Sequence, residues 1–280
     1  NSRLYEKHPD WAAAVPGRNH SEGRNQRILD LANPQVQEFV IEEMSRVFSG
    51  ADISYVKWDM NRIFSDDYSP YLPPDRQGEA AHRYICGLYH CMDVLTKRFP
   101  DILFEGCAAG GNRFDLGILC YFPQIWASDN TDAVCRLKIQ YGTSFLFPTV
   151  TMGAHVSACP NHQVGRTTSL ATRFAVAAAG NLGYELDLKK LSKEEKKEVR
   201  EQIAEYKRRR RTVQFGTYYR LTDSFQDNQS AWNIVSEDGM DVIFTHVQIL
   251  ARSAYRVPVI RLKGLDPDAV YIDCETGQEY

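Results

Sequence analysis

The sequence predicts an α/β protein with a parallel sheet, followed by a small antiparallel β domain. Short apolar runs alternate with helical stretches through residues 1–215, and from 216–280 apolar runs are joined by turn residues with no helix between them. Strands that alternate with helices form βαβ units, whereas strands joined by short turns form hairpins. The 280 residues are 43% hydrophobic and 25% charged, which is typical of a globular chain with a sizeable core.

The first helix is expected over residues 34–48. Asn33 is a favourable N-cap, Pro34 suits the first helical position, and apolar residues then recur with helical spacing. The further elements of the α/β part are expected as strand 53–58, helix 79–99, strand 102–104, a short helical piece at 115–120, strand 125–128, helix 133–141, strand 149–155, helix 169–179, strand 182–186 and a polar helix from Ser192.

In the β domain, strands are expected at 231–235, 242–250 and 269–272, with turns at 237–239 and 275–277. Only three residues follow Gly277, so the last hairpin is expected to lack a return strand. No strand precedes the first loop either. We therefore expect this chain to be a fragment of a longer protein, with a truncated β domain.

Lys57, Asp59 and Asn61 follow one another at alternate positions where an apolar strand ends. Residues i, i+2 and i+4 of a strand share a face, so a cation, a carboxylate and an amide would point the same way. Asp129 ends another apolar run, 70 residues after Asp59. Two carboxylates at the ends of different strands are what cleavage of a glycosidic bond requires. Asp132 lies at the start of the following helix, where a carboxylate caps exposed amides, and is predicted to be structural.

Other classes of function are disfavoured. A formal charge of −3 gives no overall attraction for nucleic acid or an anionic membrane, and the basic run 207–211 ends a predicted helix whose dipole it complements. No apolar run is long enough to cross a bilayer, and no signal peptide is apparent. Seven scattered cysteines favour reduced thiols, hence a cytoplasmic location, and neither a metal-ligand motif nor a phosphate loop occurs.

Several motifs resemble those of the bacterial α-galactosidases of glycoside hydrolase family 36, in the same order and spacing across nearly the whole chain. The matching segments are GRNQ at 23–26, KWDMNR at 57–62, CAAGGNRFD at 107–115, WASDNTDA at 126–133, MGAHVS at 152–157, NHQVGR at 161–166 and GYELDL at 183–188.

This resemblance implies that residues 1–215 are part of a catalytic (β/α)₈ TIM barrel, about strands 4–8, and that 216–280 begin the C-terminal antiparallel β domain. The family's large N-terminal β domain, its first barrel strands and an upstream pair of aspartates that grip the galactose hydroxyls have no counterpart in these residues. The resemblance also implies an α-galactoside oligosaccharide substrate, no cofactor, and self-association, because tetramers are common in the family.

The resemblance assigns a role to each site residue. Asp59 would be the nucleophile and Asp129 the acid/base of a retaining exo-α-galactosidase acting on raffinose or melibiose. Their carboxyl groups would face each other across about 5 to 6 Å, as double displacement requires. By similarity, the sugar pocket would be lined by Arg24, Lys57, Asn61, Cys107 and Gly110.

Alternatives remain open at this point. The same mechanism would serve an α-galactosyl transferase or an α-N-acetylgalactosaminidase. A truncated chain would instead be an inactive carbohydrate-binding piece, with an unpaired sheet edge along 53–58. Glu185 and Asp187 form a rival carboxylate pair, but side by side on one strand they cannot easily flank a sugar, so a structural role is favoured. His155 and His162 flank a predicted strand end, where contact with substrate is one reading, but such histidines more often bond to loop backbone and are left out of the predicted site.

Overall fold

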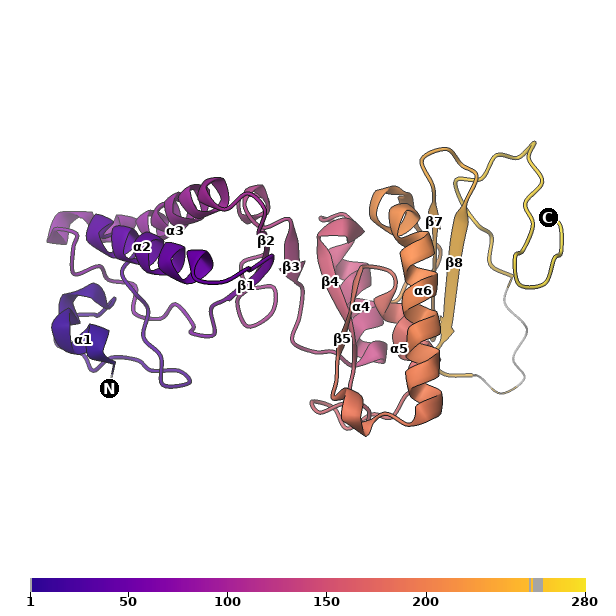
Figure 1. The fold of residues 1–280 in the computed structure, drawn as a ribbon, viewed down its shortest axis with the longest axis horizontal. Coiled ribbons are helices and arrows are strands. Elements are labelled where there is room, and N and C mark those ends of the chain that lie inside the picture. The colour runs from indigo at the N-terminus through magenta and orange to yellow at the C-terminus, as the bar shows by residue number, and fades with distance from the viewer. Residues whose placement is uncertain (1, 252, 254–258) are drawn as a thin grey trace. The chain divides into compact units, whose positions relative to one another are not determined.

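The computed structural model describes residues 2–251, 253 and 259–280 (Figure 1). Its helices and strands occur in the order α1 (Arg3–Lys7), η1 (Pro9–Trp11), α2 (Pro34–Ser49), β1 (Tyr55–Asp59), η2 (Pro74–Glu79), α3 (Ala80–Arg98), β2 (Leu103–Cys107), η3 (Ile118–Cys120), β3 (Gln124–Trp126), α4 (Ala133–Thr143), η4 (Thr149–Thr151), β4 (Met152–Ser157), α5 (Leu170–Ala177), β5 (Asn181–Glu185), η5 (Leu188–Lys190), α6 (Lys193–Phe215), β6 (Thr217–Arg220), β7 (Gln229–Val235) and β8 (Val242–Gln248).

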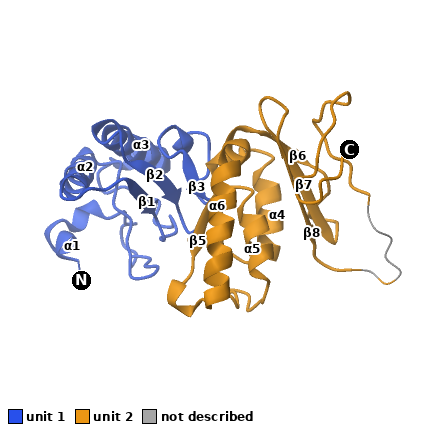
Figure 2. Cartoon of the chain, turned by 45° about the vertical axis from the view of Figure 1, so that its right-hand side comes forward, with its two compact units in different colours: residues 1–126 blue, residues 127–280 orange. Residues whose placement is uncertain are grey.

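Among the described residues, the first five strands form a parallel sheet in the order β1-β2-β3-β4-β5, and the last three form an antiparallel sheet in the order β6-β7-β8. Parallel strands in chain order, each followed by a helical segment, are the arrangement of a partial (β/α)₈ barrel. The predicted fold class is therefore confirmed. The chain divides into two compact units, residues 1–126 and 127–280, coloured separately in Figure 2.

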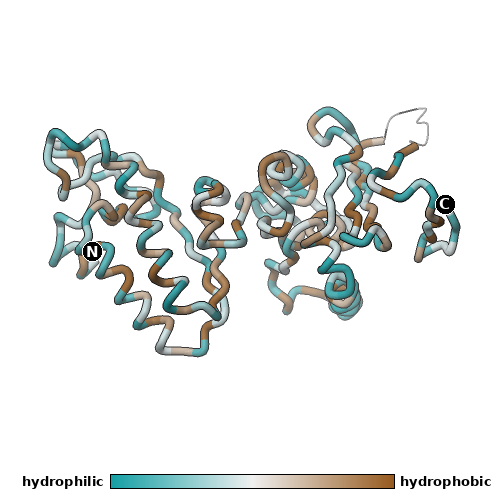
Figure 3. Tube along the Cα trace, turned by 90° about the horizontal axis from the view of Figure 1, so that it is seen from above, coloured by the Kyte–Doolittle hydropathy of each residue, from teal (hydrophilic) through white to brown (hydrophobic). Residues whose placement is uncertain are grey.

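The core of the first unit lies between its strands and helices α2 and α3, which pack side by side (Figure 1). The tubes of these two helices alternate between brown and teal in Figure 3, as expected for helices with one apolar face. Close packing here depends on Gly87 of α3. A Cβ atom at this position would lie 1.9 Å from the carbonyl oxygen of Leu31, so only glycine fits without movement.

The second unit has two apolar clusters. One joins α4, α5 and α6 to the antiparallel sheet, and the other joins β4 to α5 and α6. The predicted polar helix is α6, which begins with the expected capping box: the Ser192 hydroxyl accepts from the Glu195 amide, and the Glu195 carboxylate accepts from the Ser192 amide. One face of this helix packs on the second unit, and most of its remaining surface is exposed to solvent.

Two sequence-based expectations need correction. The strand expected at 149–155 begins only at Met152, because Thr149–Thr151 form a 3₁₀ turn after Pro148. The last hairpin is not left open: Tyr271 and Tyr280 exchange both backbone hydrogen bonds, of 3.1 and 2.9 Å, and Ile272 bridges to Glu279. Three residues beyond the turn are enough for this pairing, although no extended strand forms at 269–272. The division at residue 215 remains a prediction.

Candidate active site

The end of β1 presents the predicted polar residues on one face. Val56 and Trp58 pack against the core of the first unit, so alternation turns Lys57 and Asp59 to the opposite, open face. Asn61 follows the strand, and its Nδ2 donates to Asp59 Oδ2 over 2.6 Å. The three side chains that the sequence placed together are therefore on one side of the sheet, at the carboxyl end of β1.

The neighbouring strand β2 adds a second pair of polar groups at the same level. In the parallel register, Lys57 is opposite Glu105 and Asp59 is opposite Cys107. Cys107 is buried, and the interaction of its thiol with the Asp59 carboxylate favours the ionised carboxylate. Burial and this contact with the carboxylate raise the pKa of the Cys107 thiol to about 11, so the thiol is protonated and acts as a donor near neutral pH.

Asp59 is held in its ionised form. Partial burial acts to raise its pKa, but the Cys107 thiol, the Asn61 amide and backbone bonds at Ala109 and Met60 together outweigh burial and lower the pKa below its usual value. Hydrogen bonds to a carboxylate stabilise the charged state. An exposed, anionic and well-oriented carboxylate at the end of a parallel strand has the properties of a nucleophile.

A tight loop follows Cys107. Ala109 and Gly110 have φ values of 48° and 82°, and the Ala108 amide donates to the Gly110 carbonyl oxygen over 2.8 Å. Left-handed backbone at two successive positions is strained for alanine, whereas glycine adopts it readily. Arg113 fixes the strand ends beneath the loop, donating from Nη2 to the carbonyl oxygens of Cys107 (2.7 Å) and Trp58 (3.2 Å). Burial lowers the pKa of Arg113.

Lys57 is positioned by a buried carboxylate. Its Nζ lies 3.3 Å from Glu105 Oε1 and 4.5 Å from the centre of the Trp126 ring. Glu105 is only 1% exposed, and its other oxygen accepts from Gln124 Nε2 over 2.6 Å and from the Tyr55 hydroxyl. No hydrogen bond of good geometry reaches Oε1 among the described residues. Lys57 therefore neutralises Glu105 while the Lys57 side chain stays 36% exposed, so its ammonium group can donate further.

Arg24 lies on a different loop from the end of β1. Arg24 and Asn25 both have positive φ, 54° and 57°, and the Gln26 amide donates to Gly23, which is the geometry of a type I′ turn. Buried Arg62, the last residue of the KWDMNR motif, connects this loop to the strand by donating from Nε to Ser21 O over 3.1 Å. Arg24 is exposed, and the loop on which it lies is held to the end of β1 by the hydrogen bond from Arg62 to Ser21.

Asp129 lies in the second unit, on the loop between β3 and α4, and is exposed. Asp132 is the N-cap of α4, as predicted: its Oδ2 accepts from the Cys135 amide over 2.9 Å, and Arg166 Nε lies 3.1 Å from the same oxygen. Asp132 is 1% exposed, so it has no access to a substrate. Asp129 is therefore exposed on the loop, whereas Asp132 is buried and caps α4.

The rival carboxylates Glu185 and Asp187 make different contacts. Glu185 Oε2 lies 3.3 Å from His155 Nδ1, on the neighbouring strand, and Asp187 accepts from the Lys189 amide as the cap of η5. His155 thus contacts a carboxylate side chain on the neighbouring strand. It lies beside Gly183, where a Cβ atom would come within 2.5 Å of the imidazole ring.

A cavity of about 200 Å³ in the first unit borders Asp59. Its walls include Trp58, Met60, Leu88 and Arg113, and none of the other predicted sugar contacts. Asp59 is therefore the one predicted site residue that borders this cavity within the described part of the chain.

Three residues that hold the site in place were assigned no role from the sequence: Glu105, Arg113 and Arg136. Arg113 lies within the CAAGGNRFD motif, whereas the signal for Glu105 and Arg136 is an ionisable residue within a largely apolar stretch. Within the described ranges, no helix combines the length and apolarity needed to cross a bilayer, and no three His, Cys, Asp or Glu side chains gather as metal ligands.

Comparison with known proteins agrees across the whole chain. Residues 1–216 match the family model described as melibiase, and residues 229–280 match the glycosyl hydrolase family 36 C-terminal domain. The chain is 55% identical over 271 residues to α-galactosidase AgaA of Geobacillus stearothermophilus, covering 97% of this chain and 37% of that protein. It is 49% identical to α-galactosidase Mel36A of Lactobacillus acidophilus, covering 100% of this chain and 38% of that protein.

The crystal structure of AgaA covers 100% of this chain at 54% identity with a TM-score of 0.97, while this chain covers 39% of that structure. AgaA variants in complex with raffinose and with stachyose match equally well. The chain thus spans less than two fifths of the length of these relatives. Since a family model covers more than three quarters of its residues and the folds coincide, the chain belongs to the melibiase family of glycosyl hydrolase family 36.

Proposed function

We propose that the full-length protein carrying this chain is a retaining exo-α-galactosidase that removes terminal α-galactosyl residues from raffinose-type or melibiose-type oligosaccharides. Asp59 acts as the nucleophile and Asp129 as the acid/base. The observation that carries the proposal is the state of Asp59: an exposed carboxylate at the end of a parallel strand, kept anionic by directed donors. The named activity of the AgaA and Mel36A relatives supports the substrate class.

The pairing of the two aspartates has independent support. In AgaA, the stachyose complex carries an aspartate replaced by alanine, and the raffinose complex carries a second aspartate replaced by asparagine. The two replaced aspartates are 70 positions apart, which is also the separation of Asp59 and Asp129. Loss of a reacting carboxylate lets an intact substrate persist in a crystal, so this spacing supports the same two roles here.

In the proposed reaction, Asp59 attacks the anomeric carbon while Asp129 gives its proton to the departing oxygen, forming a galactosyl ester on Asp59. Water then attacks the same carbon as Asp129 takes up its proton, and the Asp59 ester bond breaks. Two inversions give net retention. Lys57, Arg24 and the Asn61 amide donate to sugar hydroxyls, and Cys107 with the Gly110 backbone borders the ring.

The test is turnover of p-nitrophenyl α-galactoside and raffinose by the full-length protein, with the anomer first released identified by proton NMR. We expect α-galactose to appear first and Asp59→Ala to lose at least about 10⁴-fold in kcat. Asp129→Ala should lose kcat/KM on raffinose but retain much of kcat/KM on α-galactosyl fluoride, whose leaving group needs no proton, while kcat on the fluoride falls because the second step still needs a base. Release of β-galactose first, or an active Asp59→Ala variant, would refute the proposal.

Two assays decide among the alternative activities. Product analysis with excess sucrose measures galactosyl transfer, and a 2-acetamido substrate measures α-N-acetylgalactosaminidase activity. The Cys107–Gly111 loop is the segment proposed to contact the 2-substituent. A tetrameric assembly and a cytoplasmic location are further proposals, which sedimentation of the full-length protein and cell fractionation would check.

A further inference from the structure

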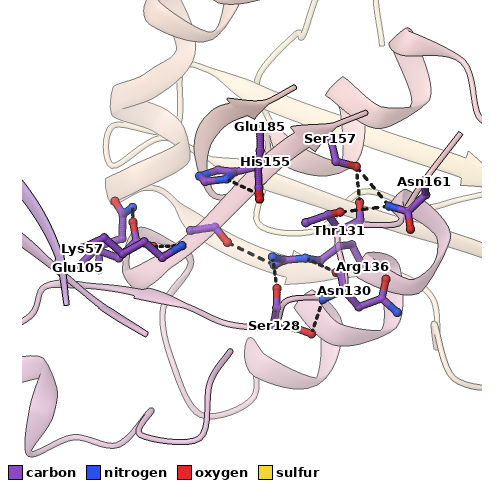
Figure 4. Close-up of polar contacts among 12 residues, drawn as sticks. Lys57, Glu105, Ser128, Asn130, Thr131, Arg136, His155, Ser157, Asn161 and Glu185 are labelled. Atoms are coloured by element: carbon purple, nitrogen blue, oxygen red, sulfur yellow. Dashed lines mark hydrogen bonds and ion pairs between the residues drawn. The ribbon is translucent and has the colours of Figure 1, made fainter. Parts of the chain in front are cut away.

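The loop that carries Asp129 is fixed by a buried arginine. Arg136 lies in the first turns of α4 and is 2% exposed. Its Nη2 donates to the Ser128 carbonyl oxygen over 2.8 Å, and its Nε donates to the Asn130 carbonyl oxygen over 2.9 Å. Figure 4 shows the guanidinium group beside both residues. Its two parallel donors therefore hold the carbonyl groups on either side of Asp129.

This geometry restricts the backbone of Asp129 directly. The Ser128 carbonyl belongs to the peptide group that precedes Asp129, and the Asn130 carbonyl begins one peptide group beyond it. With both oxygens bound to one rigid, planar group, rotation about the Asp129 backbone bonds is limited. The Asn130 amide also donates to Ser128 Oγ over 3.1 Å, closing the same short loop. The Asp129 side chain is left exposed above this clamp.

The clamp is anchored in the second unit. Arg136 Nη1 donates to the Gly153 carbonyl oxygen in β4 over 3.2 Å, so the guanidinium links the loop to the strand. The next residue of the loop is held from β4 as well, because Ser157 Oγ donates to the Thr131 carbonyl oxygen over 3.1 Å. A buried guanidinium is costly unless its donors are paired. Here two of the three acceptors, Ser128 and Asn130, are carbonyl groups of the loop that bears the proposed acid/base.

We infer that Arg136 is a positioning residue for proton transfer by Asp129: its fork fixes the loop so that the Asp129 carboxyl meets the glycosidic oxygen. This inference rests on the proposed role of Asp129. A lysine at this position has a single ammonium group and cannot bind both carbonyls in the same fixed geometry. Misplacement of a catalytic group by about 1 Å costs on the order of 100-fold in rate.

The test compares Arg136→Lys with Arg173→Lys in the full-length protein. Arg173 is a matched control, because it is also buried, lies on the next helix, and donates from Nη1 to the Ser157 carbonyl oxygen over 2.6 Å, away from the Asp129 peptide groups. For each variant, kcat/KM is measured on raffinose, which needs proton donation, and on α-galactosyl fluoride, which does not. The ratio of the two values is independent of the fraction of enzyme that is folded.

We expect Arg136→Lys to lose about 10-fold to 100-fold on raffinose and less than about threefold on the fluoride. The ratio in Arg173→Lys should stay near that of the wild type. An equal loss on both substrates in Arg136→Lys, or no loss, would overturn the inference. Should that variant fail to fold, Arg136→Gln removes the buried charge and reaches at most one of the two carbonyls, and its ratio decides in the same way. Absence of wild-type turnover on both substrates would instead refute the proposed function.

Discussion

Asp59 and Cys107 occupy paired positions at the ends of two neighbouring parallel strands, and the interaction of the Cys107 thiol with the Asp59 carboxylate acts to lower the pKa of Asp59. The pairing follows from the register, in which the Met60 amide also donates to the Cys107 carbonyl oxygen over 3.0 Å. A group on one strand thus sets the charge state of a group on the next. This relationship gives Cys107 a measurable role that is separate from contact with a sugar.

The first prediction concerns Cys107→Val. Valine cannot donate, so the ionised form of Asp59 loses one stabilising contact and its pKa rises. The acidic limb of the kcat/KM profile should therefore move to higher pH, by less than about one unit because a thiol is a weak donor. Cys107→Ser retains a donor and serves as the control, with its acidic limb at or below the wild-type position. Identical profiles for the valine and serine variants would argue against the thiol contact.

The second prediction separates the two aspartates of the second unit. Asp132→Ala removes the N-cap of α4 and the partner of Arg166, so it should destabilise the protein by about 1 to 2 kcal/mol. The expected readouts are a lower thermal midpoint and faster hydrogen exchange in the first turn of α4. Asp129→Ala should leave both nearly unchanged and abolish turnover of raffinose. A reversal of these two phenotypes would exchange the assigned roles.

Most elements that depend on contacts between residues close in the sequence could be predicted, whereas contacts between residues far apart in the sequence could not. Local signals were sufficient for α2 and α6, because Asn33 and Ser192 cap them as expected. The polar face at the end of β1 also followed from strand alternation alone. The 3₁₀ turn before β4 was missed, because Thr149 and Val150 suit a strand by propensity, whereas the turn is closed by a hydrogen bond of 3.0 Å from the Thr151 amide to the Pro148 carbonyl oxygen.

The supporting residues of the site could not be predicted, because their partners are distant in the sequence or are backbone atoms. Glu105 lies in an apolar strand, and its ion pair with Lys57 exists only through the register of β1 and β2. Arg136 has the pattern of an ordinary helical residue, yet it donates to three carbonyl groups. Every residue has a backbone carbonyl group, so a sequence motif cannot predict which of these groups will accept a hydrogen bond from a distant side chain.

The third prediction tests Glu105 as the residue that holds Lys57. Glu105→Gln keeps the shape of the side chain but removes the ion pair, so Lys57 becomes free to leave its position over Trp126. We expect KM for α-galactosides to rise about fivefold with kcat little changed, because a ground-state contact is weakened. Tyr55→Phe removes a different donor to Glu105 and should affect KM less. An unchanged KM in Glu105→Gln would show that Lys57 needs no such partner.

The fourth prediction concerns the 280 residues expressed alone. β1 pairs only with β2 among the described strands, so it forms an edge of the parallel sheet, and Tyr55 on it is 45% exposed. Unprotected parallel edges promote association. The isolated chain should therefore self-associate in sedimentation experiments and unfold without a single cooperative transition. A monomeric chain with one sharp transition would show that the edge is tolerated and would favour an independent carbohydrate-binding unit.

The fifth prediction concerns Gly87→Ala in α3. The added methyl group would lie 1.9 Å from the Leu31 carbonyl oxygen, which also accepts from Gln37 Nε2 over 2.7 Å. Backbone cannot yield as a flexible side chain does, so α3 must move away from the segment that leads into α2. Overpacking of a core costs about 1 to 3 kcal/mol, and more where backbone must shift. We expect a clear fall in the thermal midpoint of the full-length protein.

Gly78→Ala is the control, because its Cβ would meet nothing within 4 Å, and its midpoint should match the wild type. Equal midpoints for both variants would mean that Gly87 of α3 does not approach the Leu31 carbonyl oxygen as closely as described.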